Sequence, residues 1–180
     1  MEHTRLERNL TDNIYEAQLK LGYDGRPMSL NYTHSSLRHL AGEDWSDELW
    51  EGFCEAVRPR LGELGIRPVS GGYCITVPAD GTAYVHGSAP ADGGFIAELI
   101  EKVRSHGISA GDVTDLFRKY SDKVEVRELN GEEADYAVWF TDGVPDGYVY
   151  CLTEEPCMGG GCHVTYHRFI PEDFEELGLE

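Results

Sequence analysis

The chain has 180 residues, of which 41% are hydrophobic and 11% aromatic, and its formal net charge at pH 7 is -18. This length and apolar content suffice for a folded core, so we predict one domain over residues 1–180. Nucleic acids and anionic membranes attract proteins through lysine and arginine, so the acidic charge argues against both as partners.

The compartment follows from what the sequence lacks. No apolar run approaches the roughly 20 residues of a membrane span, and the first residues lack the apolar stretch of a signal peptide. Five cysteines are an odd number and too few for a disulfide scaffold. We therefore expect a cytoplasmic protein.

The N-terminal part is predicted to be mainly helical. Apolar residues spaced three and four apart predict helices over residues 4–21 and about 47–61, with a short helix around 37–40 between them. Alternating polarity predicts a short strand at 28–32. Two β-rich runs, Tyr73 to Val77 and Thr82 to His86, flank Pro-Ala-Asp-Gly and predict a hairpin.

A pair of helices is predicted next. Apolar residues from Phe95 to Val103 indicate the first, and Ser109 with Asp112 forms a capping box that opens the second. Helix, turn, helix and hairpin is also the order of elements in the core of a winged helix. Charges on this helical pair balance, so such a fold would serve protein contacts here rather than DNA.

The C-terminal half changes to period two and predicts an antiparallel meander. Four strands are expected at 123–129, 135–141, 148–152 and 162–169, followed by a short helix that starts at Pro171 and turns Phe174 and Leu177 inward. The fold class is thus α+β: N-terminal helices and a hairpin, a helical pair, the meander and a terminal helix. If the chain has two lobes, they meet near residues 87–94.

The loop Cys-Met-Gly-Gly-Gly-Cys at 157–162 is the stretch with the most chemical potential. Cys157 and Cys162 would suit a zinc site or a thiol pair, but two ligands do not complete a metal site. On a strand, Cys162 and His163 point to opposite faces, and His163 lies about 13 Å from His167. We therefore favour a flexible hairpin tip, predict no cofactor, and keep a thiol or zinc sensor as an alternative.

A polar aromatic face is the second candidate site. If the loop takes in residues 154–161, Cys151 pairs with Val164 and Val149 with Tyr166. The opposite face then collects side chains suited to a small ligand or to proton transfer. Its members would be Tyr148, Tyr150, His163, Thr165 and His167. His34 and Arg38, four residues apart near the short helix around 37–40, are a further pair that could hold an anion.

Common catalytic motifs are absent, including the nucleophile elbow, the P-loop, the dinucleotide fingerprint and the zinc-protease helix. We therefore predict a binding or protein-interaction module of unknown partner, with a protein or a second copy of the chain as the occupant. The alternative is an enzyme or small-molecule-binding protein that uses the tyrosine and histidine face.

Several short motifs resemble a family of uncharacterised bacterial proteins of about this length. They are EAQLKLGY at 16–23, SLNY at 29–32, SLRHL at 36–40, YVYCLT at 148–153 and YHRF at 166–169. The resemblance covers nearly the whole chain. It implies a cytosolic bacterial protein with no assigned activity, and it carries over no catalytic residue.

Overall fold

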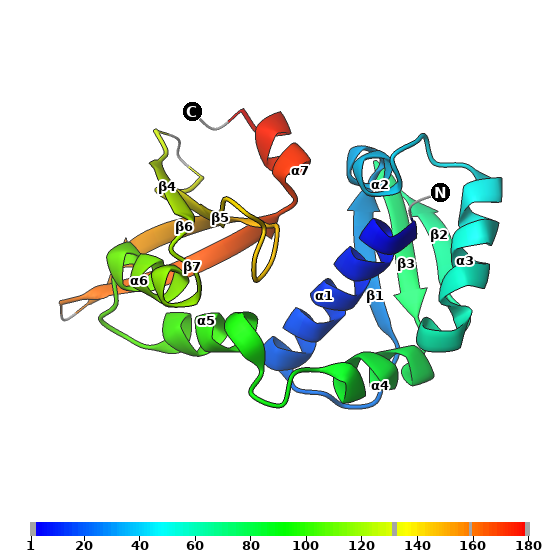
Figure 1. Cartoon of the computed structure of the whole chain (residues 1–180), viewed down its shortest axis with the longest axis horizontal. Helices are drawn as coiled ribbons and strands as arrows, with labels where there is room; N and C mark the ends of the chain where they lie inside the picture. The colour runs from blue at the N-terminus through cyan, green and yellow to red at the C-terminus, as the bar shows by residue number, and fades with distance from the viewer. Residues whose placement is uncertain (1–2, 131–132, 159, 179–180) are drawn as a thin grey trace. The chain divides into compact units, whose positions relative to one another are not determined.

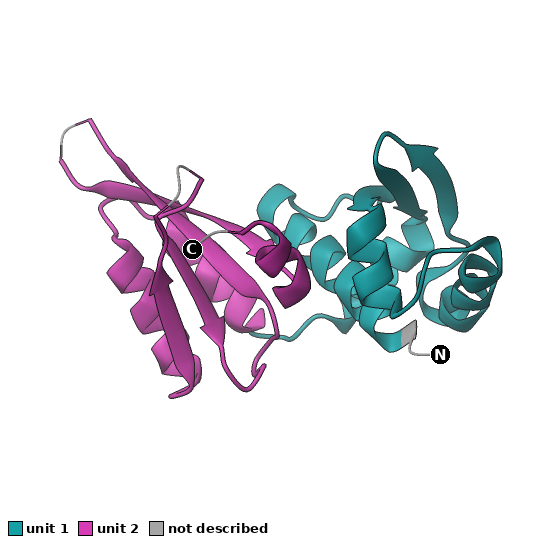
Figure 2. Ribbon diagram, turned by 90° about the horizontal axis from the view of Figure 1, so that it is seen from above, with its two compact units in different colours: residues 1–92 teal, residues 93–180 magenta. Residues whose placement is uncertain are grey.

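The computed structural model describes residues 3–130, 133–158 and 160–178. The chain divides into two compact units, a first unit of residues 1–92 and a second unit of residues 93–180 (Figure 2). Each is described below by itself. The α+β class is confirmed, because helices and two antiparallel sheets make up the chain. That residues 1–180 act as one domain stays a prediction.

The first unit begins with the predicted helix and strand. α1 spans His3–Leu21, and β1 spans Met28–Thr33 (Figure 1). The short helix α2 spans His34–Ala41, with the Thr33 side chain accepting a hydrogen bond from the Ser36 backbone N–H. Gly42 follows with a φ of 75°, a conformation that glycine adopts without strain. Local sequence signals therefore set both ends of α2.

The rest of the first unit is a longer helix, a hairpin and a fourth helix. α3 spans Asp47–Leu61, β2 spans Gly65–Val69, β3 spans Gly72–Val77 and α4 spans Ala79–Ser88. β3 pairs with both β1 and β2, so the strand order is β1-β3-β2. Helix, strand, two helices and a hairpin with this strand order is the connectivity of a winged helix.

The predicted hairpin was wrong in its second strand. Residues 82–86 lie in α4. The strand that forms a hairpin with β3 is β2, across the turn at Ser70 and Gly71. Thr82 is held in the helix because its hydroxyl donates to the carbonyl oxygens of Ala79 and Arg26, at 3.0 and 2.9 Å. Contacts within the unit thus override the β propensity of this segment.

The core of the first unit lies between its helices and the sheet. The fully buried side chains come from α1, α2, α3 and β3 and include Leu6, Leu10, Ile14, Leu37, Phe53, Val57, Leu61 and Ile75. The helical positions among them are the apolar residues whose spacing predicted the three helices. α4 adds Val85 and packs against α1 and α3.

The second unit confirms the helical pair and the meander. α5 spans Gly94–Arg104 and α6 spans Ala110–Tyr120, and both hydrogen bonds of the capping box at Ser109 and Asp112 are present. The strands are β4 (Val124–Glu128), β5 (Tyr136–Phe140), β6 (Val149–Pro156) and β7 (Cys162–Phe169), paired in sequence order. The hairpin after the helical pair therefore continues into a four-stranded sheet, and the winged-helix connectivity belongs to the first unit instead.

The two faces of this sheet are covered differently. On one, here called the α5–α6 face, Phe95 and Phe117 contact Phe140 and Tyr150 at ring-centroid distances between 4.9 and 5.7 Å. On the other, the α7 face, a buried cluster joins Phe174 to the sheet. That helix, α7, spans Pro171–Glu176. Leu177 is 42% exposed just beyond it, so its predicted inward orientation was wrong.

Among the described residues, no helix is long and apolar enough to cross a membrane.

Candidate functional site

The glycine loop is the tip of the β6–β7 hairpin. Pairing continues to Pro156 and Cys162, so the strand extends to Pro156 rather than ending at residue 152 as the sequence predicted. The tip is closed by the Cys157 backbone N–H, which donates to the Gly161 carbonyl at 3.0 Å. The Gly107 N–H of the α5–α6 turn donates to the Cys162 carbonyl at 3.0 Å. Backbone contacts thus fix the base of the loop on both sides.

Cys157 and Cys162 are free and partly buried. In the described part of the chain, neither belongs to a group of three or more side chains that would hold a metal ion together. His163 pairs with Glu155 and points to the sheet face opposite Cys162. A zinc or thiol sensor at Cys157 and Cys162 stays a prediction, and the fold supplies no third ligand beside them among these residues.

The predicted register of β6 and β7 was wrong. Cys151 pairs with His167 rather than Val164, and Val149 pairs with Phe169 rather than Tyr166. The cause is the loop, which is only five residues long and so extends the ladder toward its tip. Because the shift is an odd number of residues, it exchanges the faces of one strand relative to the other.

The predicted tyrosine and histidine face is therefore not assembled. His163 and His167 lie on the α7 face, where His167 is exposed. Tyr150 lies on the α5–α6 face, fully buried, and its hydroxyl donates to Oδ2 of Asp146 at 2.6 Å. Burial, with the nearby Asp146 carboxylate second, raises the pKa of Tyr150 well above its ordinary value. Its hydroxyl is thus a neutral donor at physiological pH.

Tyr148 precedes β6 and is nearly buried, with the Arg168 guanidinium 4.2 Å from the centre of its ring. Its surroundings are a packed cation–π pair rather than an open ligand surface. Ligand binding by Tyr148, Tyr150, His163 and His167 stays a prediction, but the four side chains do not share one face.

His34 and Arg38 lie one turn apart on α2, as predicted, and both are exposed. The His34 ring meets the Tyr73 ring edge to face at 5.3 Å. His34 is thereby tied to the surface of the hairpin rather than to Arg38. Anion binding by the two residues stays a prediction.

A surface that the sequence analysis missed surrounds this histidine. Trp45 in the loop before α3 lies 5.7 Å from Trp50 on α3 and 5.9 Å from Tyr73 on β3, measured between ring centroids. All three rings are partly exposed. Half-exposed tryptophan and tyrosine are the residue types that most often dominate binding energy at protein interfaces.

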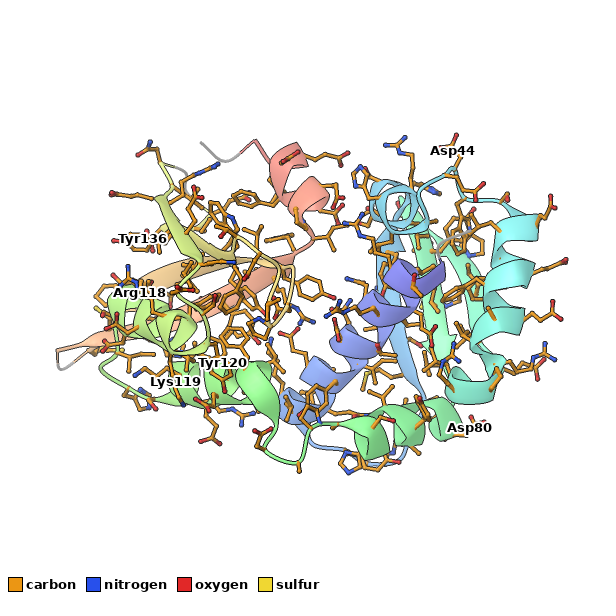
Figure 3. All side chains as sticks on the ribbon, in the orientation of Figure 1. Asp44, Asp80, Arg118, Lys119, Tyr120 and Tyr136 are labelled. Carbon is orange, nitrogen blue, oxygen red and sulfur yellow. The ribbon has the colours of Figure 1, made fainter. Side chains whose placement is uncertain are left out.

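Carboxylates surround these rings. From residue 43 to residue 57 the chain has six acidic residues and no lysine or arginine. All six are exposed, and within the described part of the chain none forms an ion pair. They are Glu43, Asp44, Asp47, Glu48, Glu51 and Glu55, and Figure 3 labels Asp44 in the loop that leads into α3. We call these carboxylates and the three rings the acidic aromatic face.

A groove of about 350 Å³ runs along α3 beside this face. The residues that line it are Trp50, Glu51, Cys54, Glu55, Arg58, Glu63 and Leu64. Burial raises the pKa of the Cys54 thiol to about 11, opposed by Arg58 and increased by Glu63. Cys54 is therefore a protonated wall residue at neutral pH and not a nucleophile.

The signal for this surface was present in the sequence. Six acidic residues and two tryptophans lie between residues 43 and 55, in the loop before α3 and on α3 itself. The acidic run gives no indication of the third ring, because Tyr73 on β3 is distant in sequence from Trp45 and Trp50.

Comparison with known proteins places the whole described chain in one family. Searches of curated proteins and of solved structures each return no significant match. One family model matches residues 3–178, and its description is "Domain of unknown function, E. rectale Gene description (DUF3877)". The match confirms the resemblance to a family without an assigned function. The chain belongs to this family, the domain of unknown function DUF3877.

Proposed function

We propose that the chain is a protein-binding module whose first unit uses a winged-helix fold to bind a lysine- and arginine-rich segment of a partner protein. The carrying observation is the set of six exposed, unpaired carboxylates on and before α3, next to the Trp45, Trp50 and Tyr73 rings. α3 corresponds in the order of elements to the helix that enters the major groove in DNA-binding helix-turn-helix proteins.

Charge argues for a basic protein and against DNA. A helix in the major groove lies between two phosphate backbones, and phosphate contacts supply much of the affinity. Six carboxylates with no lysine or arginine between residues 43 and 57 would repel those phosphates. The same carboxylates attract ammonium and guanidinium groups, which also bind to the faces of tryptophan rings.

The same charge argues against a second copy as the partner. In a symmetric dimer through this face, the acidic run of one chain would lie against the acidic run of the other. Like charges at close range are unfavourable, so the face suits a different protein. We further propose that the module works in the cytoplasm, which is consistent with five free cysteines among the described residues.

The test uses a synthetic basic dodecapeptide, four repeats of Arg-Ala-Lys, with an acidic dodecapeptide and a short DNA duplex as comparisons. Binding of the basic peptide should change the emission of Trp45 and Trp50 and should weaken as salt is added. The double variant Glu51→Gln, Glu55→Gln should weaken binding about five- to tenfold, because each exposed charge pair contributes up to about 1 kcal/mol.

A matched control separates this face from the general acidity of the chain. Glu128→Gln, Glu155→Gln removes two exposed carboxylates of the second unit and should change the affinity less than about twofold. Equal losses in both double variants would show non-specific attraction and refute the proposal. Tighter binding of the duplex than of the basic peptide would also refute it.

A further inference from the structure

A cavity of about 360 Å³ lies in the second unit, between the α7 face of the sheet and α7. Figure 1 shows α7 against one end of this sheet. Trp139 and Val149 contribute to the wall on the sheet, and Phe174 contributes from α7. The volume is at the lower end of the range for small-molecule sites. We call it the α7 cavity.

Two opposite charges line the α7 cavity without pairing with each other. Arg127 on β4 and Glu175 on α7 both belong to its wall. In the part of the chain that the structure describes, neither side chain takes part in an ion pair. Lys123, directly before β4, does form an ion pair, with Asp142 at 3.5 Å. An unpaired arginine is unexpected where residues 121–180 carry fifteen acidic residues and only three basic ones.

The Arg127 guanidinium is held in place by a ring. Its central carbon lies 5.3 Å from the centre of the Trp139 ring. Arginine on an aromatic ring keeps its N–H donors available, and these donors suit the two oxygens of a carboxylate. Trp139 lies on the α7 face because it pairs with Val149, a member of the buried cluster there. The sheet therefore presents an oriented cation next to an aromatic surface.

We propose that the α7 cavity binds a small zwitterion with a flat apolar group, of the chemical class of an aromatic amino acid. Its carboxylate binds Arg127, its ammonium binds Glu175, and its ring lies against Trp139 and Phe174. A ligand with both charges satisfies both unpaired groups at once, whereas a ligand with one charge leaves the other unpaired. The inference concerns residues 93–180 only and is independent of the function proposed for the first unit.

Three related probes separate the two charges. L-phenylalanine has both, N-acetyl-L-phenylalanine has only the carboxylate, and L-phenylalanine amide has only the ammonium. Binding is followed by the NMR signal of the Trp139 indole N–H, which is assigned by its loss in Trp139→Phe. L-phenylalanine should shift this signal, leave those of Trp45 and Trp50 unchanged, and bind about tenfold more tightly than either derivative.

Charge-removing variants should exchange the preferences. Arg127→Gln should weaken L-phenylalanine binding about tenfold and make L-phenylalanine and its amide bind equally. Glu175→Gln should make L-phenylalanine and the N-acetyl derivative bind equally. Both residues are exposed, so neither change disturbs the core. Arg118→Gln is the control, because Arg118 is an exposed cation of the same unit on α6 (Figure 3).

Three results would overturn the proposal. The first is no shift of the Trp139 signal with any probe up to its solubility limit. The second is equal binding of the three probes to the unmodified chain, which would mean that the charges play no part. The third is an Arg127→Gln variant that binds L-phenylalanine as well as Arg118→Gln does.

Discussion

Replacing Gly81 by alanine tests whether α4 packs as described. Gly81 is the third residue of α4 and is buried. A Cβ atom at this position would lie 2.2 Å from the Leu61 carbonyl oxygen and 2.6 Å from Cγ1 of Val77. The first of these is a backbone atom at the end of α3, so no side-chain rotation relieves the overlap. The two helices would have to separate.

The size of the effect follows from two opposing contributions. Glycine to alanine within a helix normally stabilises by about 0.5–1 kcal/mol. Overpacking a tight interior costs about 1–3 kcal/mol, and more where backbone must move. Gly81→Ala should therefore lower the free energy of unfolding by about 1–2 kcal/mol. Gly87→Ala, in the same helix but with no atom within 4 Å of its added Cβ, should raise it by up to about 1 kcal/mol.

Urea unfolding provides the assay. In a Trp139→Phe background only Trp45 and Trp50 remain, and both lie in the first unit, so tryptophan emission reports that unit alone. The two variants should shift the unfolding midpoint in opposite directions at an unchanged slope. A Gly81→Ala midpoint equal to or above that of Gly87→Ala would refute the close packing of α4 on α3.

Three further predictions concern hydrogen bonds of the second unit and the reactivity of the thiols in both units. Ser109→Ala should destabilise it by about 1 kcal/mol in urea unfolding, because the hydroxyl accepts a hydrogen bond from the Asp112 N–H. Hydrogen bonds from the Ser109 backbone and then its side chain lower the pKa of Asp112. The stabilisation by the ionised Asp112 carboxylate is therefore present above the ordinary pKa of about 3.9 and disappears as pH falls through the lower folded pKa. Asp112→Asn should remove that acid dependence, and an unchanged acid profile would contradict it. Tyr150→Phe should cost about 1–3 kcal/mol near neutral pH through the lost bond to Asp146. Because the raised pKa of Tyr150 makes stability fall once pH exceeds about 10, this cost should shrink in alkaline solution, and a constant cost would refute the assignment. In iodoacetamide labelling with mass spectrometry, the partly exposed loop thiols should react first. The buried thiols and the Cys54 thiol, whose pKa is raised to about 11, should react later, and the reverse order would contradict the burial. The fast group is Cys157 and Cys162, and the slow group is Cys54, Cys74 and Cys151.

Much of the fold could be predicted because its signals are local. The capping box at Ser109 and Asp112 uses residues three apart, and both of its hydrogen bonds form. Apolar spacing located the helices because each stripe faces a core within its own unit. The four strands of the meander were found because their β-branched and aromatic runs are separated by glycine-containing turns, which are local signals.

The helix α4 could not be predicted because its cause is not local. Residues 82–86 have β-branched and aromatic side chains, and Gly81 is typical of a turn. Gly81 is instead the contact point with the Leu61 carbonyl, twenty residues away. Gln18 on α1 adds a second distant contact, since its side-chain amide donates to the Thr82 carbonyl at 2.9 Å. Neither contact leaves a mark within the segment itself.

The same distinction decides the candidate sites. The predicted tyrosine and histidine face required the right strands and also the right register, and the loop was taken to be three residues longer than it is. That error pairs Cys151 with Val164 instead of His167 and so places the two histidines on the face of Tyr150, whereas the observed register puts them on the opposite face. A strand's existence depends on its own alternation, but which side chains share a face depends on the length of the turn. The pairing of β4 with β5 brings Trp139 and Arg127 together on the α7 face. Their proximity depends on β4 and β5 being paired, so it appears only once the strands are in register.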